Sequence, residues 1–405
     1  MDECAVSVEH MTNAVIVDAV RTGGGRGKKD SGKLSNWHPV DLAAEVLKAL
    51  VDRNKLDPAL VDDVIMGCVM QVGEQALNIG RSAVLAAGFP ETVPATSVDR
   101  QCGSSQQSAH FAAQGVIAGA YDIVIAAGVE VMSRVPMGAS MGGGFGMPMG
   151  PAVGKRYAAV GGMVPQGISA EMIADKWNIS RDDLDAFAAQ SHQRAAKARE
   201  EGRFANEIIP VKVKDANGNE TDEVFDYDEG IRPDSTSETL AKLKPAFKPD
   251  GKVTAGNSSQ ITDGASAVLI MSEEKAKQLG LTPRARFHTF ALAGVDPVTM
   301  LTGPIPSTTK VLERAGMTID QIDLFEVNEA FASVVLAWEK EHNPDMSKVN
   351  VNGGAIALGH PLGGSGTKLM GTLLNELERT GGRYGLQTMC EGGGLANATI
   401  IERLG

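Results

Sequence analysis

The sequence predicts an α/β protein made of two similar halves, with a less regular segment inserted into the first half. Three observations favour this class. Short β-branched runs alternate with stretches of helical periodicity, a pattern that implies a parallel or mixed sheet covered by helices on both faces. The two halves share an order of apolar runs and glycine-rich loops. Between residues 132 and 260 the regular alternation stops.

The first strand and the first helix show the pattern. Residues 14–17 form a β-branched run, which predicts a strand. Leu42, Val46 and Leu50 recur at helical spacing, which predicts a helix over 39–51. By the same criteria, the elements that follow are a strand over 61–69, a helix over 78–87, a strand at 97–98 that ends near Cys102, a helix over 104–118 and a strand over 123–128.

The middle of the chain differs in composition. Residues 137–167 are rich in methionine and glycine, a charged helical stretch follows over 180–201, and Asn217-Gly218-Asn219 predicts a polar hairpin. Regular patterning returns over 263–279 and continues to the end. The predicted organisation is a disordered tail at 1–10, a first half at 11–131 plus 261–283, an inserted loop domain at 132–260 and a second half at 284–405.

A weak internal repeat relates the two halves. An apolar run at 61–66 precedes Cys102 by nearly the same distance as a similar run at 322–327 precedes His360. Duplication of one α/β unit would place the two reactive loops face to face across a pseudo-twofold axis.

Length and charge limit the class of protein. A chain of 405 residues exceeds the ~100–200 residues of a typical domain, so more than one core is expected. Lys and Arg number 38 against 50 Asp and Glu, and the net charge of −12 argues against nucleic acid or an anionic membrane as partner. No apolar run approaches the ~20 residues that span a bilayer.

The cysteines and the two ends of the chain indicate the cellular compartment in which the protein is expected. Cys4, Cys68, Cys102 and Cys390 show no CxxC spacing and are too few for a disulfide scaffold, so a reducing compartment is expected. The N-terminus lacks the basic and apolar segments of a secretory signal, and the C-terminus is not a peroxisomal address. These features predict a cytoplasmic protein.

Cys102 is the first candidate for chemistry. It lies between a predicted strand and a predicted helix and is followed by Gly103, Ser104 and Ser105. The positive end of a helix dipole favours thiolate, so a pKa well below the ordinary ~8.5 is expected for this thiol. The alternative is a buried structural cysteine, because free cysteine often behaves as a small hydrophobic residue.

His360 lies in a glycine-dense stretch at 350–366, directly before a proline. So many glycines indicate sharp turns or close approach to a ligand. A histidine there is suited to activate a thiol or to stabilise an oxyanion. The alternative is a loop histidine in solvent.

Two further loops carry candidate residues. Cys390 ends a predicted strand that opens into Gly392, Gly393 and Gly394, whose backbone N–H groups are suited to bind an oxyanion; the alternative is a core cysteine beside a flexible turn. Asn328 follows an apolar strand and is a candidate positioning residue, or alternatively a helix N-cap.

Five blocks in a fixed order resemble the thiolase family, in register from about residue 12 to the end. They are Arg-Gln-Cys-Gly-Ser around Cys102, Gly-Asn-Ser-Ser-Gln at 256–260 with Asp-Gly-Ala at 263–265, Asn-Glu-Ala-Phe-Ala at 328–332, Gly-His-Pro-Leu-Gly at 359–363, and Cys-Glu-Gly at 390–392. The resemblance implies the thiolase fold: two duplicated α/β halves that form an α/β/α/β/α layered core, with a loop domain inserted in the first.

The resemblance also implies residue roles. Cys102 is expected to be the acylated nucleophile, His360 its activating base and part of an oxyanion hole, and Cys390 the acid and base for the α-carbon of acetyl-CoA. Asn328 is expected to orient a water in the first oxyanion hole, and the N–H groups of Cys102 and Gly392 to form the second. Coenzyme A (CoA) and acyl-CoA are expected as substrates, without a metal or separate cofactor, and a homodimer or homotetramer is expected.

The inserted domain is the expected binding region for CoA. The residues that align with family contacts are Arg232, Thr239, Phe247, Ala255 and Ser259, with Ala330 and Phe331 along the pantetheine path. For Arg232 the alternative is an ordinary surface arginine.

Some residues depart from the acetoacetyl-CoA branch of the family. Pro165-Gln166 stand where a His-Met pair is common, and the methionines of 137–163 are suited to form an adaptable wall because methionine repacks easily. Gly364 replaces a Cys or Ala of relatives, and extra space is expected there. We therefore expect a 3-ketoacyl-CoA thiolase with a broad or degradative role, acting on bulky or steroid-derived chains.

Three alternatives stand beside this prediction. The first is an acetoacetyl-CoA-specific biosynthetic thiolase. The second is a decarboxylating ketoacyl synthase, whose site pairs one Cys with two His, whereas Cys390 occupies the second reactive loop here. The third is a thiolase-fold protein that binds acyl-CoA or lipid without catalysis.

Overall fold

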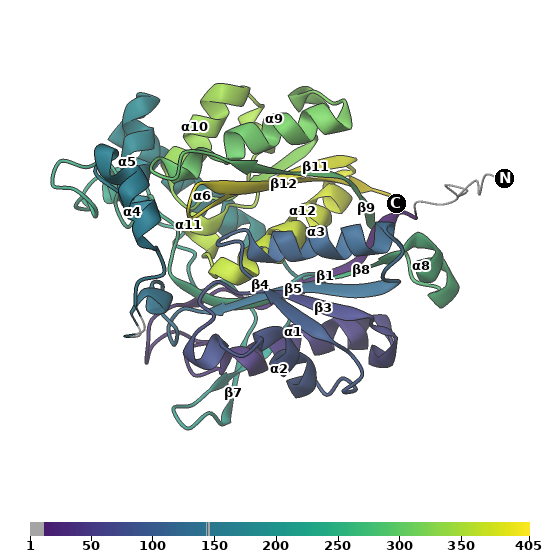
Figure 1. Ribbon diagram of the computed structural model, residues 1–405. Coiled ribbons are helices and arrows are strands. Elements are labelled where there is room, and N and C mark those ends of the chain that lie inside the picture. The colour runs from purple at the N-terminus through teal and green to yellow at the C-terminus, as the bar shows by residue number, and fades with distance from the viewer. Residues whose placement is uncertain (1–11, 143, 145) are drawn as a thin grey trace.

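The computed structural model describes residues 12–405 except Gly143 and Phe145, so the tail expected at 1–10 lies outside the described residues. The elements form five layers, with two sheets that enclose a central pair of helices (Figure 1). The helices of the layers, from one outer face to the other, are α1 (Pro39–Asn54) and α2 (Ile79–Ala86), then α3 (Ser104–Ile117) and α12 (Ser365–Thr380), then α9 (Pro304–Ala315) and α10 (Ala332–His342).

The strands follow the order β10-β11-β12-β9-β1-β8-β5-β3-β4, with β2 paired to β8. Their bounds are β1 (Ala14–Arg21), β2 (Gly25–Arg26), β3 (Asp63–Gly67), β4 (Ala95–Val98), β5 (Ile123–Val131), β8 (Thr262–Ser272), β9 (Ala285–Gly294), β10 (Leu324–Val327), β11 (Tyr384–Glu391) and β12 (Leu395–Arg403). The pairing between β1 and β9 spans two residue pairs, Val15 with Arg286 and Ile16 with Ala285, so the two sheets meet at one short junction.

The strand pairing confirms the predicted duplication. In the first half, β1 pairs with β8 and β8 with β5 in antiparallel fashion, and β5 pairs with β3 in parallel. In the second half, β9, β12, β11 and β10 repeat the same sequence of pairings. The helices correspond too: α3 and α12 follow equivalent positions of the two halves and pack against each other between the sheets (Figure 1).

The central helices are adapted to burial on every side. α3 is built largely of Ser, Gln and Ala, and ten of its side chains are buried, because sheets and α12 surround it. Small residues permit close approach. A Cβ added at Gly366 of α12 would overlap the backbone nitrogen of Gln106 in α3. This contact holds the N-terminal ends of α3 and α12 together.

Gly366→Ala tests the contact. The added methyl group meets backbone rather than a flexible side chain, so we expect the free energy of unfolding to fall by ~1–3 kcal/mol, as for other overpacked core sites. Denaturant unfolding followed by circular dichroism measures the change. Gly154→Ala, on an exposed helix where a Cβ meets no atom within 4 Å, should cause no loss. Equal stability of the two variants would contradict this account of the packing.

The chain leaves the first sheet after Val131 and returns at Thr262. The excursion contains α4 (Pro151–Tyr157), α5 (Gln166–Lys176), α6 (Arg181–Glu200), the hairpin of β6 (Val211–Lys214) and β7 (Glu220–Phe225), and α7 (Ser237–Leu240). The hairpin predicted around Gly218 is confirmed. The predicted charged helix is also present, and it begins at a capping box between Ser180 and Asp183. After β8, the short helix α8 (Glu273–Leu279) leads to the second half.

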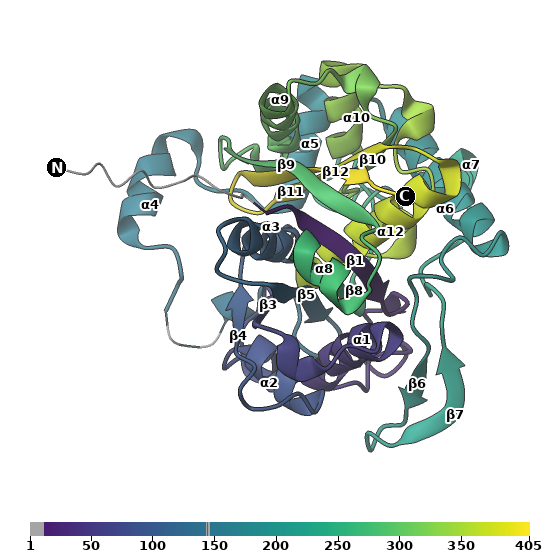
Figure 2. The same ribbon diagram turned by 90° about the vertical axis from the view of Figure 1, so that its right-hand side faces the viewer.

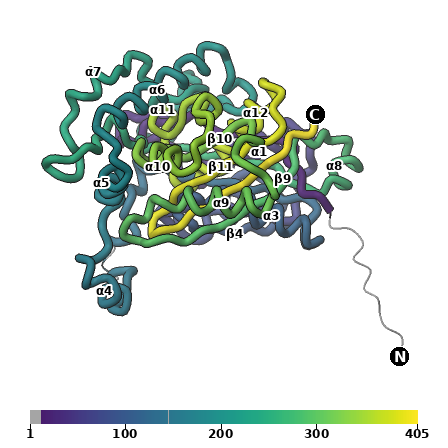
Figure 3. The backbone as a smooth tube through the Cα atoms, turned by 90° about the horizontal axis from the view of Figure 1, so that it is seen from above, coloured from purple at the N-terminus to yellow at the C-terminus, as the bar shows by residue number. Residues whose placement is uncertain are grey.

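The helices of the inserted segment differ in how closely they pack on the two halves. α5 and α6 pack on the second half, whereas α4 stands away from the main body (Figures 2 and 3). No helix in the described part of the chain is long and apolar enough to span a membrane.

Candidate active site

The candidate catalytic residues follow strands that end at one region of the molecule. Cys102 comes after β4, Asn328 after β10, and Cys390 lies at the end of β11. His360 follows a segment that runs parallel to β10 through a bridge between Phe325 and Val349. Strands β10 and β11 are parallel, so the Asn328 and Cys390 loops leave the same edge of their sheet, whereas β4 belongs to the other sheet and its loop meets them through the contact of Gly103 with Glu391.

The loop of Cys102 is tightly turned. Gln101 has a φ of 48°, a left-handed conformation that is uncommon for residues other than glycine. The next residue, Cys102, is 5% exposed. A Cβ added at Gly103 would overlap the Glu391 carboxyl group, and the Asn397 amide donates to the Gly103 carbonyl at 3.0 Å. The Cys102 loop is therefore pressed against the end of β11.

The expectation of a lowered Cys102 pKa is wrong for this structure. Burial raises the pKa of the Cys102 thiol well above its ordinary value, and Cys390, Glu391 and Glu130 raise it further. The helix dipole is the weaker effect here: α3 begins at Ser104, so the sulfur precedes the first turn. Cys102 is thus a neutral thiol at rest and needs a base to become a nucleophile.

His360, the residue that the family resemblance assigns as this base, is itself buried and hydrogen-bonded. It is 3% exposed, so the alternative of a solvent histidine is wrong. Its Nδ1 lies 2.5 Å from Ser365 Oγ, and the Ser365 hydroxyl donates to the Pro361 carbonyl at 2.8 Å. Since the serine hydrogen is used in that bond, Oγ accepts from Nδ1–H, and Nε2 keeps its lone pair.

The electrostatic surroundings keep the His360 ring neutral. Burial and the nearby Lys368 lower the pKa of His360 to about 3. Its backbone N–H donates to Thr262 Oγ1 at 3.0 Å, which fixes the loop to the start of β8. A neutral imidazole with a free Nε2 is a proton acceptor at neutral pH.

Cys390 and Asn328 lie together. Burial raises the pKa of the Cys390 thiol to about 12, and Glu391 adds to the rise, while the Asn328 side chain and the Ala330 backbone N–H oppose it. The Asn328 N–H donates to the Thr388 carbonyl at 3.0 Å, which joins the two loops. Helix α10 begins at Ala332, so the alternative role of Asn328 as a helix N-cap is wrong.

Two buried nitrogen atoms in this region have no hydrogen bond of full geometry among the described residues. They are Nε2 of His360 and Nδ2 of Asn328, and the Asn328 side chain lies beside the Cys390 thiol. Buried polar atoms are rarely left unpaired unless a ligand or water satisfies them. These atoms are therefore suited to hold a substrate oxygen.

Gly392 lies where the loop that follows β11 meets the loop of Cys102. A Cβ added at Gly392 would lie 3.0 Å from Gln101 Oε1, the residue directly before Cys102. Gly393 and Gly394 continue with φ values of 81° and 80°, which side chains rarely adopt. The turn thus places backbone N–H groups beside the Cys102 loop.

Glu130 is a structural residue of the site that sequence analysis missed. Its carboxylate, at the end of β5, accepts from the N–H groups of Val69 (2.9 Å) and Gly363 (2.9 Å) and from the Gln75 amide (2.7 Å). One buried carboxylate therefore joins the first half to the loop that follows His360. The sequence signal, an acidic residue inside an apolar strand, was available but does not reveal its partners.

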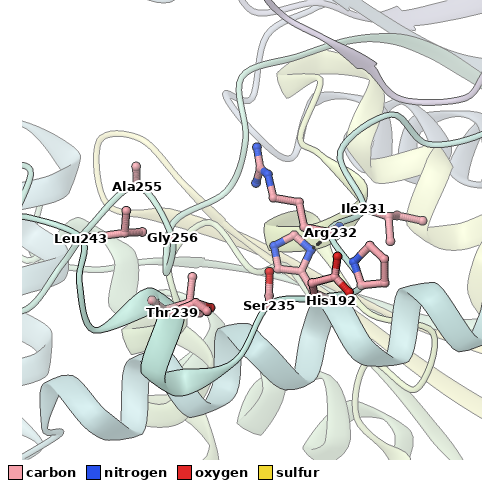
Figure 4. Close-up of a pocket in the computed structure, with 11 residues that line it drawn as sticks. His192, Ile231, Arg232, Ser235, Thr239, Leu243, Ala255 and Gly256 are labelled. Carbon is pink, nitrogen blue, oxygen red and sulfur yellow. Dashed lines mark hydrogen bonds between the residues drawn. The ribbon is translucent and has the colours of Figure 1, made fainter.

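A pocket of about 700 Å³ opens in the inserted region. Figure 4 shows Arg232, Thr239 and Ala255, three of the predicted CoA contacts, together on its wall. His192 of α6, which sequence analysis missed, lies beside them and accepts the Arg232 backbone N–H at Nδ1 (3.1 Å). Burial and Arg232 lower the pKa of His192 to about 4, so the neutral ring carries its hydrogen on Nε2.

The other four predicted contacts lie outside this pocket wall but close to one another. The Ser259 N–H donates to the Ala330 carbonyl at 2.9 Å, and the rings of Phe247 and Phe331 pack edge to face at a centroid distance of 6.0 Å. The segment that starts at Ala255 therefore runs from the pocket to the loop of Asn328.

Comparisons with known proteins agree with this geometry. Profiles of the thiolase N-terminal and C-terminal domains match residues 14–274 and 281–403. The chain belongs to the thiolase family. Both matches are to thiolase domains, which favours a thiolase over the ketoacyl synthase alternative, and thiolases are acyltransferases.

Relatives of this thiolase are similar over almost their whole length. The steroid 3-ketoacyl-CoA thiolase FadA6 of Mycobacterium tuberculosis is 51% identical, over 97% of this chain and 95% of the relative. The 3-ketoacyl-CoA thiolase of Photobacterium profundum is 48% identical, and the match covers 97% of this chain and 100% of the relative. The crystal structure of the Bacillus anthracis acetyl-CoA acetyltransferase matches with a TM-score of 0.88 at 40% sequence identity. The match covers 97% of this chain and 99% of the acetyltransferase chain.

The candidate site combines two buried thiols with raised pKa values and an imidazole whose Nε2 has no partner among the described residues. In the part of the chain that the structure describes, no group of three or more His, Cys, Asp or Glu side chains is arranged to hold a metal ion.

Proposed function

We propose that this thiolase cleaves 3-ketoacyl-CoA with CoA, giving acetyl-CoA or another short acyl-CoA and a shortened acyl-CoA, and that it also runs the reverse Claisen condensation. The observation that carries the proposal is the close placement of Cys102, Cys390 and Asn328, together with buried side-chain nitrogens on Asn328 and His360 that lack a hydrogen-bond partner among the described residues. A ping-pong sequence through an acyl-Cys102 intermediate follows from this arrangement.

In the first half-reaction, Cys102 attacks the 3-keto carbon while Nε2 of His360 accepts the thiol proton. The keto oxygen becomes an oxyanion, held by the N–H groups of Cys102 and Gly392, while the His360 Nε2–H so formed and a water that the Asn328 amide orients face the thioester oxygen of the departing acetyl-CoA. The bond between the α- and β-carbons then breaks. The electron pair leaves on the acetyl-CoA carbanion, which takes the Cys390 proton, and the acyl group stays on Cys102.

In the second half-reaction, CoA enters and the Cys390 thiolate accepts its thiol proton. The CoA thiolate attacks the acyl-Cys102 thioester, and the N–H groups of Cys102 and Gly392 hold the resulting oxyanion. When the intermediate collapses, the Cys102 sulfur leaves and recovers its proton from His360. Each well-placed oxyanion donor is worth ~3–4 kcal/mol in such steps.

CoA would bind from the 700 Å³ pocket to the cysteines. Its nucleotide end fits the wall formed by Arg232, Thr239 and His192, where a guanidinium group is suited to phosphate. Its pantetheine arm would follow the segment from Ala255 to Ser259 and the loop of Phe331. No separate cofactor enters the reaction.

Arg232→Ala tests the nucleotide end. Loss of an interaction that is equal in ground and transition states should raise the KM for CoA about tenfold and leave kcat within about twofold. Steady-state thiolysis with varied CoA measures both constants. Arg199→Ala, on the exposed face of α6, is the matched control and should change neither. An unchanged KM in Arg232→Ala would place CoA elsewhere.

The acyl group is proposed to be long, bulky or steroid-derived. The names of two relatives, one of them a steroid 3-ketoacyl-CoA thiolase, support this choice over the acetoacetyl-CoA-specific alternative. Thiolysis of a panel from acetoacetyl-CoA to long-chain and ring-bearing 3-ketoacyl-CoAs tests it. We expect kcat/KM to rise with acyl size, and equal or better turnover of acetoacetyl-CoA would reject the proposal. Labelling of Cys102 by a thiol reagent, blocked by acyl-CoA, distinguishes an enzyme from the non-catalytic alternative.

A homodimer or homotetramer in the cytoplasm is proposed as well. β4 is the last strand of its sheet, so its outer edge has no partner strand among the described residues. Leu77 and Leu85, near this edge, are 93% and 46% exposed. An unpaired edge beside apolar side chains is suited to pairing with a second copy. Sedimentation analysis across concentrations tests this, and a monomer at micromolar concentration would reject it.

A further inference from the structure

Lys368 is a buried cation with no assigned part in the chemistry above. It lies on α12, three residues after Ser365, and is 5% exposed. Its Nζ donates to the backbone carbonyls of Leu358 (2.8 Å) and Gly359 (3.0 Å), the two residues before His360. Burial of an ammonium group costs free energy, so its retention next to a reactive loop requires an explanation.

Two nearby carboxylates, Glu207 and Asp228, account for only part of this burial. Arg21 forms ion pairs of 2.7 Å with both, which leaves one of their two negative charges to be balanced by Lys368, yet no ion pair within 4.0 Å joins Lys368 to a carboxylate among the described residues. Burial lowers the pKa of Lys368 to about 8, and Asp228 and Glu207 oppose the shift. Lys368 is thus protonated at neutral pH, and its hydrogen bonds go to the loop of His360.

We propose that Lys368 is a positioning residue for acyl transfer: its ammonium group clamps the carbonyls of Leu358 and Gly359, fixes the backbone that carries His360, and keeps a positive charge near the imidazole. The inference rests on the proposed function, because it assumes that His360 is the base for Cys102.

The clamp has a clear geometric reason. Gly359 has a φ of 81°, and a Cβ there would overlap Thr262, so the loop passes through a conformation that glycine alone adopts readily. Helix α12 holds this loop at two points, with Ser365 bonded to the ring and Lys368 bonded to the backbone. A displacement of ~1 Å in a catalytic group costs on the order of 10²-fold in rate.

The charge of Lys368 has a separate effect. Burial is the largest cause of the lowered pKa of His360, and the positive charge of Lys368 is the second. The other charged groups that act on Lys368 itself are Asp228, Arg21, Glu207 and Glu326. Loss of the lysine charge should therefore raise the pKa of His360, and the free Nε2 would be lost to protonation at a higher pH.

Three substitutions separate the two effects. Lys368→Met removes the hydrogen bonds and the charge, Lys368→Gln keeps a donor without charge, and Lys368→Arg keeps the charge and donors. Lys310→Met is the matched control, because Lys310 also donates to a backbone carbonyl (Leu292, 2.9 Å) but lies on α9. Readouts are kcat and KM for CoA in thiolysis of acetoacetyl-CoA, and the rate of Cys102 alkylation by iodoacetamide from pH 2.5 to 8, a range that includes the lowered pKa of His360.

We expect Lys368→Met to lower kcat at least tenfold with KM for CoA within twofold, and Lys368→Arg to regain at least threefold. The acid limb of Cys102 alkylation should move up by at least half a pH unit in the Met and Gln variants and stay in place in the Arg and Lys310 variants. An unchanged kcat, or a loss that arginine does not restore together with an unmoved acid limb, would overturn the inference. If the parent enzyme cleaves no 3-ketoacyl-CoA, the proposed function fails, while the alkylation profiles still decide the role of Lys368.

Discussion

Cys102→Ala is expected to abolish thiolysis, with kcat lowered by at least ~10⁴-fold, because the acyl group then has no sulfur to which it can transfer. The substitution removes a small buried group, so the fold should persist. Rapid quenching with a 3-ketoacyl-CoA, followed by mass spectrometry of the Cys102 peptide, should show an acyl adduct in the parent enzyme. The variant should show none, and its burst phase should vanish.

Cys68→Ala is the matched control for this experiment. Cys68 is also fully buried, and burial likewise raises the pKa of its thiol well above the ordinary value, yet its side chain packs in the core of the first half. Its replacement should leave kcat within about threefold while losing ~1 kcal/mol of stability for a smaller side chain. If Cys102→Ala kept more than a hundredth of the parent kcat, the acyl-Cys102 intermediate would be excluded.

Much of the fold could be predicted from local patterns. The helix expected over 39–51 is α1, and the helix expected over 104–118 is α3, each with bounds within three residues. α5 was not predicted, because its stability comes from packing against α10 rather than from a strong apolar stripe of its own. The order of strands in the sheets also depends on contacts between distant segments, although the internal repeat already indicated a duplicated unit.

The candidate site was predictable as a set of motifs but not as an electrostatic environment. Short sequence blocks indicated Cys102, His360, Asn328 and Cys390 as candidates because each block has a fixed local sequence. The raised pKa of Cys102 depends on burial and on residues more than 25 positions away in the chain, such as Glu130. The place of His192 in the pocket wall could not be predicted either, because it depends on the packing of α6 against the distant segment of Arg232.

His360→Ala is expected to lower kcat by ~10³–10⁵-fold, because one side chain serves both as base for Cys102 and as oxyanion donor. Each role alone is worth ~10²–10⁴ in rate, and the two are not additive because both act on the same step. KM for CoA should change little, since the nucleotide pocket lies on α6, α7 and the segment of Arg232. Stopped-flow measurement of acyl-enzyme formation should locate the loss in the first half-reaction.

The pH dependence gives the most direct test of His360 as a base. The base form is the neutral ring, which is present above its pKa and lost as the pH falls through it. Since that pKa is lowered to about 3, His360 is neutral throughout pH 5–8, and the rate of acyl-enzyme formation should show no acid limb from this residue in that range.

Ser365→Ala removes the acceptor that fixes the tautomer of His360, with Nδ1–H bonded and Nε2 free. The ring should then divide between two tautomers, and kcat should fall by about tenfold, a loss well below that of His360→Ala. A control, Ser347→Ala, removes an exposed hydroxyl that bonds Asp345 at the short 3₁₀ helix Met346–Lys348 and should leave kcat unchanged. A loss in Ser365→Ala as large as that in His360→Ala would contradict the proposal that Ser365 only orients the ring, because orientation of a ring that is still present cannot account for the full effect of removing it.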